Sequence, residues 1–105
     1  MAFSEIGVDD LAERLDLGAR LVDVREQDEW EHGHIGGAVH VPLSAVPQRV
    51  DAFRGDGPTY VICKVGSRSL RACDHLSGLG IEVVNVAGGM FAWERSGRAI
   101  VTGPT

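Results

Sequence analysis

Residues 59–69 read TYVICKVGSRS, and this stretch decides the fold class. Its first five residues form a continuous β-prone run, which is typical of a central strand buried on both faces of a parallel sheet. The predicted strand ends at Cys63, a tight loop follows, and a helix is expected to begin near Ser67. A buried strand that leads directly into a helix indicates an α/β domain in which strands and helices alternate.

The sequence on both sides repeats this alternation. Apolar spacing predicts further strands at 20–25, 38–41 and 81–86, and helices at 8–17, 67–79 and 90–95. Residues 26–31 favour one short acidic helical turn, and residues 43–53 a helix weakened by Pro47. Alternating elements imply parallel strands, and ligands of such sheets bind at the carboxyl ends of the strands, where Cys63 is expected.

Length and composition indicate one globular domain spanning residues 1–105, with 44% hydrophobic and 24% charged residues. A net charge of −5 disfavours nucleic acid and anionic membranes as partners. The sequence has no apolar run approaching the ~20 residues that a membrane helix needs. The N-terminus also lacks the pattern of a signal peptide. We therefore expect a cytoplasmic protein, and a monomer because nothing indicates an obligate dimer.

The two cysteines are expected to be free thiols with different roles. Cys63 and Cys73 lie ten residues apart, which suits neither a disulfide framework nor a zinc site. Cys73 shares an apolar helix face with Leu76 and is predicted to belong to the core. A resolving role for Cys73 would need it close to Cys63, yet six helical residues after Ser67 place it ~9 Å from the start of the helix.

Cys63 is the candidate nucleophile because its loop should favour a thiolate. The backbone N–H groups of the loop can converge into an anion-binding concavity, and the following helix adds a partial positive charge. Lys64, Arg68 and Arg71 supply formal positive charge in a stretch without acidic residues from 59 to 73. The pKa of Cys63 is therefore expected below the ~8.5 of a free cysteine. The alternative is an inert cysteine buried at a strand end.

Four motifs in order resemble those of the rhodanese-like domains across nearly the whole chain. They are Asp23-Val24-Arg25-Glu26, then Gly33 to Ala38 with Pro42, then Cys63-x-x-Gly66-x-Arg68-Ser69, and finally Gly88-Gly89-Met90-x-x-Trp93. The resemblance implies a five-stranded, mainly parallel sheet flanked by helices. It also implies that Cys63 accepts sulfane sulfur as a persulfide, and the proposed mechanism requires neither a metal nor an organic cofactor.

The implied activity is sulfur transfer from a small anionic donor, thiosulfate or a persulfide, to cyanide or a thiol. The loop residues that would hold the sulfur are Lys64, Val65, Gly66, Ser67, Arg68 and Ser69.

Three further residues are expected to support that loop. Asp23 and Arg25 could brace it, although a surface ion pair of Arg25 with Glu26 or Glu29 fits the sequence equally well. His34 could contact substrate, but a histidine beside glycines more often bonds a loop backbone. The acidic residues 28–31 are most simply a solvated face.

Two rival functions fit the same residues. One is a phosphatase or arsenate reductase, but cysteine-dependent phosphatases place their arginine six positions after the cysteine, whereas Arg68 follows Cys63 by five. The other is a relay or regulatory module that passes a persulfide to a partner protein, or uses the fold only for docking. An intact loop argues against complete loss of reactivity, yet it does not separate an enzyme from a relay component.

Overall fold

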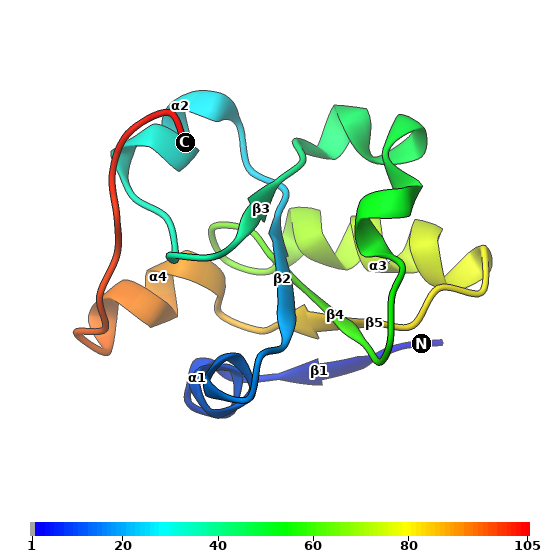
Figure 1. Ribbon diagram of the computed structural model, residues 1–105, viewed down its shortest axis with the longest axis horizontal. Coiled ribbons are helices and arrows are strands. Elements are labelled where there is room, and N and C mark those ends of the chain that lie inside the picture. Colours follow the sequence, from blue (N-terminus) through cyan, green and yellow to red (C-terminus); the bar gives the residue numbers. More distant parts are fainter. Residues whose placement is uncertain (1) are drawn as a thin grey trace.

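The computed structural model describes residues 2–105 and is built on one five-stranded sheet (Figure 1). The strands lie in the order β1-β5-β4-β2-β3, and each neighbouring pair is parallel. Their bounds are β1 Ser4–Ile6, β2 Arg20–Asp23, β3 Val39–His40, β4 Thr59–Ile62 and β5 Val83–Val86. The expected α/β class with a five-stranded sheet is confirmed, and its strand pairing is parallel throughout.

Helices cover both faces of this sheet. The α-helices are α1 Val8–Asp16, α2 Gln27–His32, α3 Ser67–Gly78 and α4 Gly89–Arg95, and two 3-10 helices are η1 Leu43–Gln48 and η2 Val50–Phe53. Side chains of α3, η1 and η2 pack on one face in a cluster that includes both cysteines. Side chains of α1 and α4 pack on the other face.

Two elements differ from the sequence-based expectation. Strand β1 was not predicted from the apolar pattern, because its three residues SEI hold only one apolar side chain and two of them stay exposed. Residues 43–53 form two short 3-10 helices rather than one α-helix. Pro47 lies inside the first of these, and its missing N–H prevents a continuous α-helical hydrogen-bond ladder.

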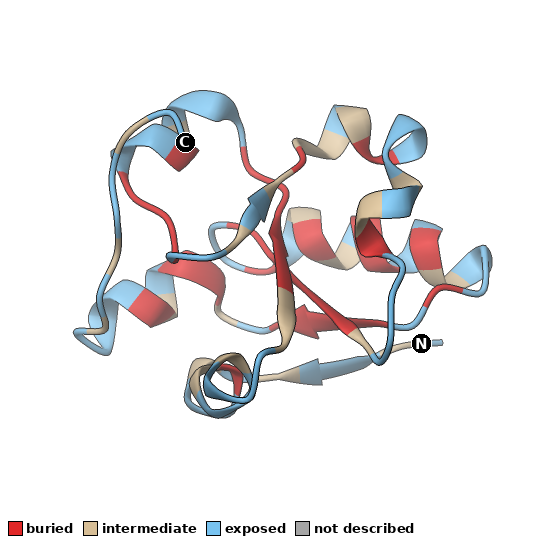
Figure 2. Ribbon diagram, viewed as in Figure 1, coloured by how far each residue is buried: buried red, intermediate tan, exposed pale blue. Residues whose placement is uncertain are grey.

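The deepest part of the molecule is the centre of the sheet (Figure 2). All residues of β4 and β5 are buried, as expected for central strands covered on both faces. The buried strand β4 therefore holds Cys63 at the carboxyl edge of the sheet on a rigid support.

Among the described residues, no helix is long and apolar enough to span a bilayer.

Candidate active site

The loop after β4 wraps around the sulfur of Cys63. The backbone N–H of Gly66 lies 3.2 Å from Sγ, and the backbone N–H and hydroxyl of Ser69 each lie 3.3 Å from it. Gly66 is the N-cap residue of α3 and makes this geometry possible. Its backbone φ of 107° is one that residues other than glycine rarely adopt. The strand, the loop and the first turn of the helix thus place two backbone N–H groups and one hydroxyl around one sulfur.

These hydrogen bonds set the pKa of Cys63 below that of an ordinary thiol. Burial alone raises the pKa, but the hydroxyl and N–H of Ser69 and the N–H groups of Gly66 and Val65 more than offset it. The expected direction of the shift is therefore confirmed, and its main favourable cause is local hydrogen bonding. Ser69 is one of the loop residues predicted to hold the sulfur, but the part played by its hydroxyl depends on a side-chain rotamer that spacing along the chain does not predict.

The first turn of α4 holds the backbone carbonyl groups at the beginning of the same loop. The N–H of Met90 donates to the carbonyl of Cys63 at 2.8 Å, and the N–H of Phe91 donates to that of Lys64 at 2.9 Å. Gly89 has a φ of 54°, and a Cβ at this position would collide with both carbonyl groups. The second glycine of the Gly88-Gly89 pair is therefore needed for close approach to the cysteine loop.

Asp23 and Arg25 form a buried ion pair after the neighbouring strand β2. Arg25 Nη2 lies 2.8 Å from Asp23 Oδ2 and also donates to the carbonyl of Gly33 at 2.8 Å. The surface pair of Arg25 with Glu26 or Glu29, which the sequence left open, is not the one observed. Both side chains are almost fully buried, so removal of one partner would leave an uncompensated charge. The pair ties β2 to the segment that follows α2.

His34 has a structural environment. Its Nδ1 lies 2.7 Å from the carbonyl oxygen of Trp30, and its ring stacks on the Trp30 indole with 3.5 Å between ring centroids. The side chain is buried, and its backbone N–H bonds the carbonyl of Val101. The ring thus bonds backbone, as expected of a structural histidine, but the carbonyl belongs to α2 and not to a loop.

Arg68 pairs with Glu29 across 39 residues of sequence. Its two terminal nitrogens lie 2.6 Å and 2.8 Å from the two carboxylate oxygens of Glu29. The hydrogen bond from Arg68 lowers the pKa of Glu29 to about 2. The acidic stretch is thus more than a solvated face, and the positive charge of Arg68 is already partnered. Spacing along the chain gave no signal for so distant a pair.

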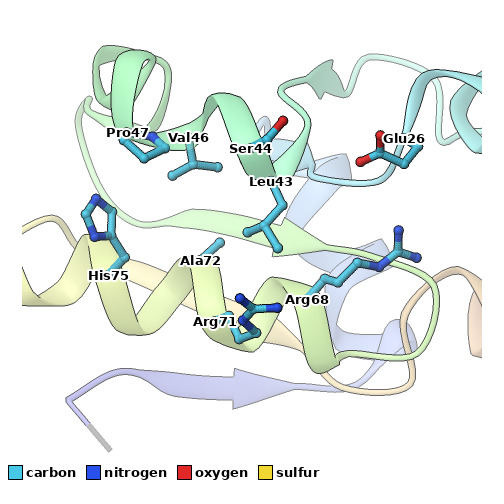
Figure 3. A pocket seen from close by; sticks show the side chains of 9 residues that line it. All are labelled: Glu26, Leu43, Ser44, Val46, Pro47, Arg68, Arg71, Ala72 and His75. Atoms are coloured by element: carbon cyan, nitrogen blue, oxygen red, sulfur yellow. The ribbon is translucent and has the colours of Figure 1, made fainter.

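Two hollows flank the loop, and the remaining cations are divided between them. The first has a volume of about 480 Å³ and runs between η1 and α3, with Arg68 and Arg71 on its α3 side (Figure 3). Its other lining residues are Glu26, Leu43, Ser44, Val46, Pro47, Ala72 and His75. The second has a volume of about 260 Å³. It places Lys64 and Arg25 beside three carboxylates, those of Asp28, Glu29 and Glu94. The expected concentration of positive charge is therefore partly cancelled by acidic neighbours.

The loop residues differ in exposure. Lys64, Val65 and Ser67 are exposed, whereas Gly66, Ser69 and Cys63 itself are buried. Cys63 has no accessible surface in this conformation. A donor can reach its sulfur only after a local displacement of the loop or of side chains at its mouth.

Cys73 occupies the core, as expected. It is buried in the same cluster as Cys63 but on the inner face of α3. Burial, together with the smaller effects of the nearby charges of Glu5 and Cys63, raises the pKa of Cys73 to about 12. A thiol of this kind is protonated at neutral pH and therefore unreactive.

A parallel sheet that presents a hydrogen-bonded cysteine in a short loop between a central strand and a helix defines a class of cysteine-dependent domains. A family model for the rhodanese-like domain matches residues 7–96, and the chain belongs to that family.

Individual relatives agree over nearly the full length. The chain is 36% identical over 96 residues to the candidate sulfurtransferase YtwF of Bacillus subtilis, covering 90% of this chain and 93% of that protein. It is 35% identical over 101 residues to a sulfurtransferase of Allochromatium vinosum, covering 93% and 94%. The crystal structure of a rhodanese-related protein from Thermoplasma volcanium matches with a TM-score of 0.87 and 32% identity, covering 94% of this chain and 98% of that one.

Proposed function

We propose that this protein is a sulfurtransferase that carries sulfane sulfur on Cys63. The observation that carries the proposal is the set of three hydrogen bonds from Gly66 and Ser69 to the Cys63 sulfur. They favour the thiolate, which is the attacking form. The names of the full-length relatives support the same class of reaction.

The reaction has two balanced half-reactions. In the first, the Cys63 thiolate attacks the outer sulfur of thiosulfate, the sulfur–sulfur bond of the donor breaks, and sulfite leaves with the bonding pair. Cys63 then holds a persulfide anion. In the second, cyanide attacks the terminal sulfur, thiocyanate leaves, and the thiolate is restored. An organic persulfide donor and a thiol acceptor follow the same course, with a thiolate and a new persulfide as products. Such covalent catalysis predicts ping-pong kinetics.

The size of the loop supports sulfur over phosphoryl transfer. A persulfide adds one atom to Cys63, whereas a transferring phosphoryl group brings three equatorial oxygens that need surrounding donors. Two of the loop's N–H groups are already directed at the sulfur itself. The guanidinium of Arg68, which a phosphate would require, is engaged by both oxygens of Glu29.

The setting of the site bears on its partners. The hollow beside Lys64 carries three carboxylates, so a small dianion such as thiosulfate meets repulsion as well as attraction there. A mechanism that needs a free Cys63 thiol suits a reducing compartment, which supports the cytoplasm as the location. We further propose that the chain acts as a monomer with a single rhodanese-like domain.

Mass spectrometry tests the proposal directly. The protein is treated with thiosulfate or with a small organic persulfide, and the mass of the Cys63 peptide is measured before and after addition of cyanide. We expect a gain of one sulfur atom that cyanide removes as thiocyanate, and no gain in Cys63→Ser. Absence of the adduct with every donor would contradict the proposal. An adduct that forms only from a persulfidated protein would favour the relay function, and hydrolysis of aryl phosphates at a comparable rate would favour the phosphatase.

A further inference from the structure

Asn85 is a buried amide in the centre of an otherwise apolar strand. It stands among three valines in β5 (VVNV) and is 1% exposed. In the sheet it lies level with Glu5 of β1 on one side and Val61 of β4 on the other. Cys63 comes two residues after Val61 and therefore projects to the same face of the sheet. Asn85 is thus placed beside the support of the catalytic loop.

The amide nitrogen of Asn85 joins this loop to the edge strand β1. Its Nδ2 donates to the carbonyl of Gly66 at 3.3 Å and to Oε2 of Glu5 at 2.7 Å. The neighbouring Glu5 carboxylate can only accept hydrogen bonds, so the nitrogen of the amide must face it. Both hydrogens of the amide are therefore used, one on the loop and one on the anchor.

Gly66 is the residue through which this bond can act on the sulfur. The N–H of Gly66 donates to Cys63 Sγ, while its carbonyl accepts from Asn85 Nδ2 and from the N–H of Leu70 at 3.2 Å. Gly66 has a left-handed φ of 107°. A rotation at Gly66 that moved the carbonyl away from Asn85 would also move the N–H relative to the sulfur. The contact between β5 and the loop thus bears on the hydrogen bonds that lower the pKa of Cys63.

The oxygen of the Asn85 amide shows that packing alone does not explain why an asparagine occupies this position. Its Oδ1 is buried and has no hydrogen-bond partner among the described residues. A buried acceptor without a partner destabilises the fold, and valine would match the rest of the strand without that cost.

We propose that Asn85 is a positioning residue for sulfur transfer, which holds Gly66 so that its N–H stays on the Cys63 sulfur, and that Glu5 orients the Asn85 amide. This role rests on Cys63 as the sulfur-carrying residue.

Asn85→Val is the main test, read out by three measurements on the full chain. These are urea denaturation, the pH dependence of Cys63 alkylation by iodoacetamide, and steady-state sulfur transfer. We expect stability equal to or above that of the native protein, a raised Cys63 pKa, and a roughly tenfold lower kcat (about 1.4 kcal/mol in barrier) with little change in KM. Native Cys63 pKa and kcat in a folded Asn85→Val variant would overturn the proposal.

A second pair of variants decides the question if Asn85→Val does not fold. Glu5→Ala and Glu5→Gln remove the same negative charge from an exposed position, but only glutamine keeps an oxygen that can accept from Asn85. Any effect of the lost charge on Cys63 is the same in both variants. We therefore expect a higher Cys63 pKa in Glu5→Ala than in Glu5→Gln, and equal values in the two would overturn the proposal. Alkylation needs no sulfur donor, so failure of the sulfurtransferase activity would be recognised separately.

Discussion

The two cysteines of this protein share one core cluster, yet their environments are opposite. Cys63 lies before the start of α3, where the free N–H groups of the first turn point at its sulfur. Cys73 lies inside α3, away from the free N–H groups of the first turn and among apolar side chains of the core cluster. The pKa of Cys63 is lowered and that of Cys73 is raised to about 12. Position relative to a helix end, rather than depth of burial, therefore separates a reactive thiol from an inert one.

Replacing each cysteine in turn should give the largest difference in activity between two variants. Cys63→Ser should remove all detectable sulfur transfer and leave the fold intact, because the nucleophile is lost. Cys73→Ala should keep kcat within about twofold while costing about 1 kcal/mol of stability, as for a small buried truncation. Sulfur transfer assays and urea denaturation of both variants check this. An inactive but folded Cys73→Ala variant would point to a two-thiol mechanism.

Gly89→Ala should disturb Cys63 and spare Cys73. The added Cβ would meet the carbonyl groups of Cys63 and Lys64, and the left-handed φ adds about 1–2 kcal/mol of strain. We expect a clearly lower free energy of unfolding and a slower rate of sulfur transfer. Gly97→Ala, which has a φ of 79° but open space around its Cβ, is the matched control for backbone strain. Equal losses of activity in the two variants would show that contact with the loop is unimportant.

The pH dependence of stability should show the two thiols with opposite signs. Cys63 has a folded pKa below its unfolded value, so its contribution is present above about 8.5 and is lost as pH falls through the folded pKa. Cys73 has a raised folded pKa, so its contribution is present below about 8.5 and is lost as pH rises towards 12. Urea denaturation from pH 6 to pH 10 should show the alkaline loss in Cys63→Ser and its absence in Cys73→Ala. A steep alkaline loss that survives in Cys73→Ala would assign it to another group.

The ion pair of Arg68 with Glu29 should have the smallest effect on stability. Both side chains are about 30% exposed, and pairs of this kind contribute about 0–1 kcal/mol. Because the folded pKa of Glu29 is about 2, that contribution should be lost only as pH falls from about 4.5 towards 2.

Glu29→Gln should nevertheless change access to the two cysteines unequally. Removal of the carboxylate releases Arg68 at the mouth of the loop, so alkylation of Cys63 should become faster while that of Cys73 stays undetectable in the folded protein. Arg98→Gln, which breaks the separate pair with Asp9, is the control. Unchanged alkylation of Cys63 would show that another displacement opens the site.

The sequence alone determined most of the framework of this protein. The β-prone run of residues 59–63, the glycine at position 66 and the helical spacing after Ser67 predicted the strand, the loop and the helix around Cys63. These signals are local, because strand propensity, a left-handed turn and amphipathic spacing are each encoded within a few residues. The core position of Cys73 followed from the same spacing.

The contacts that connect this framework come from residues far apart in the sequence and were not predicted. The pairing of Arg68 with Glu29, the approach of Gly89 to the cysteine loop and the bond from Asn85 to Gly66 each join residues at least 19 positions apart. Strand β1 was missed for the same reason, because its three residues form a strand only by pairing with β5, which lies far away in the sequence. Such contacts depend on side-chain direction and on strand order, which neighbouring residues in the sequence do not encode. The sequence thus placed a reactive cysteine, and the fold decided which groups hold it and which charges remain free.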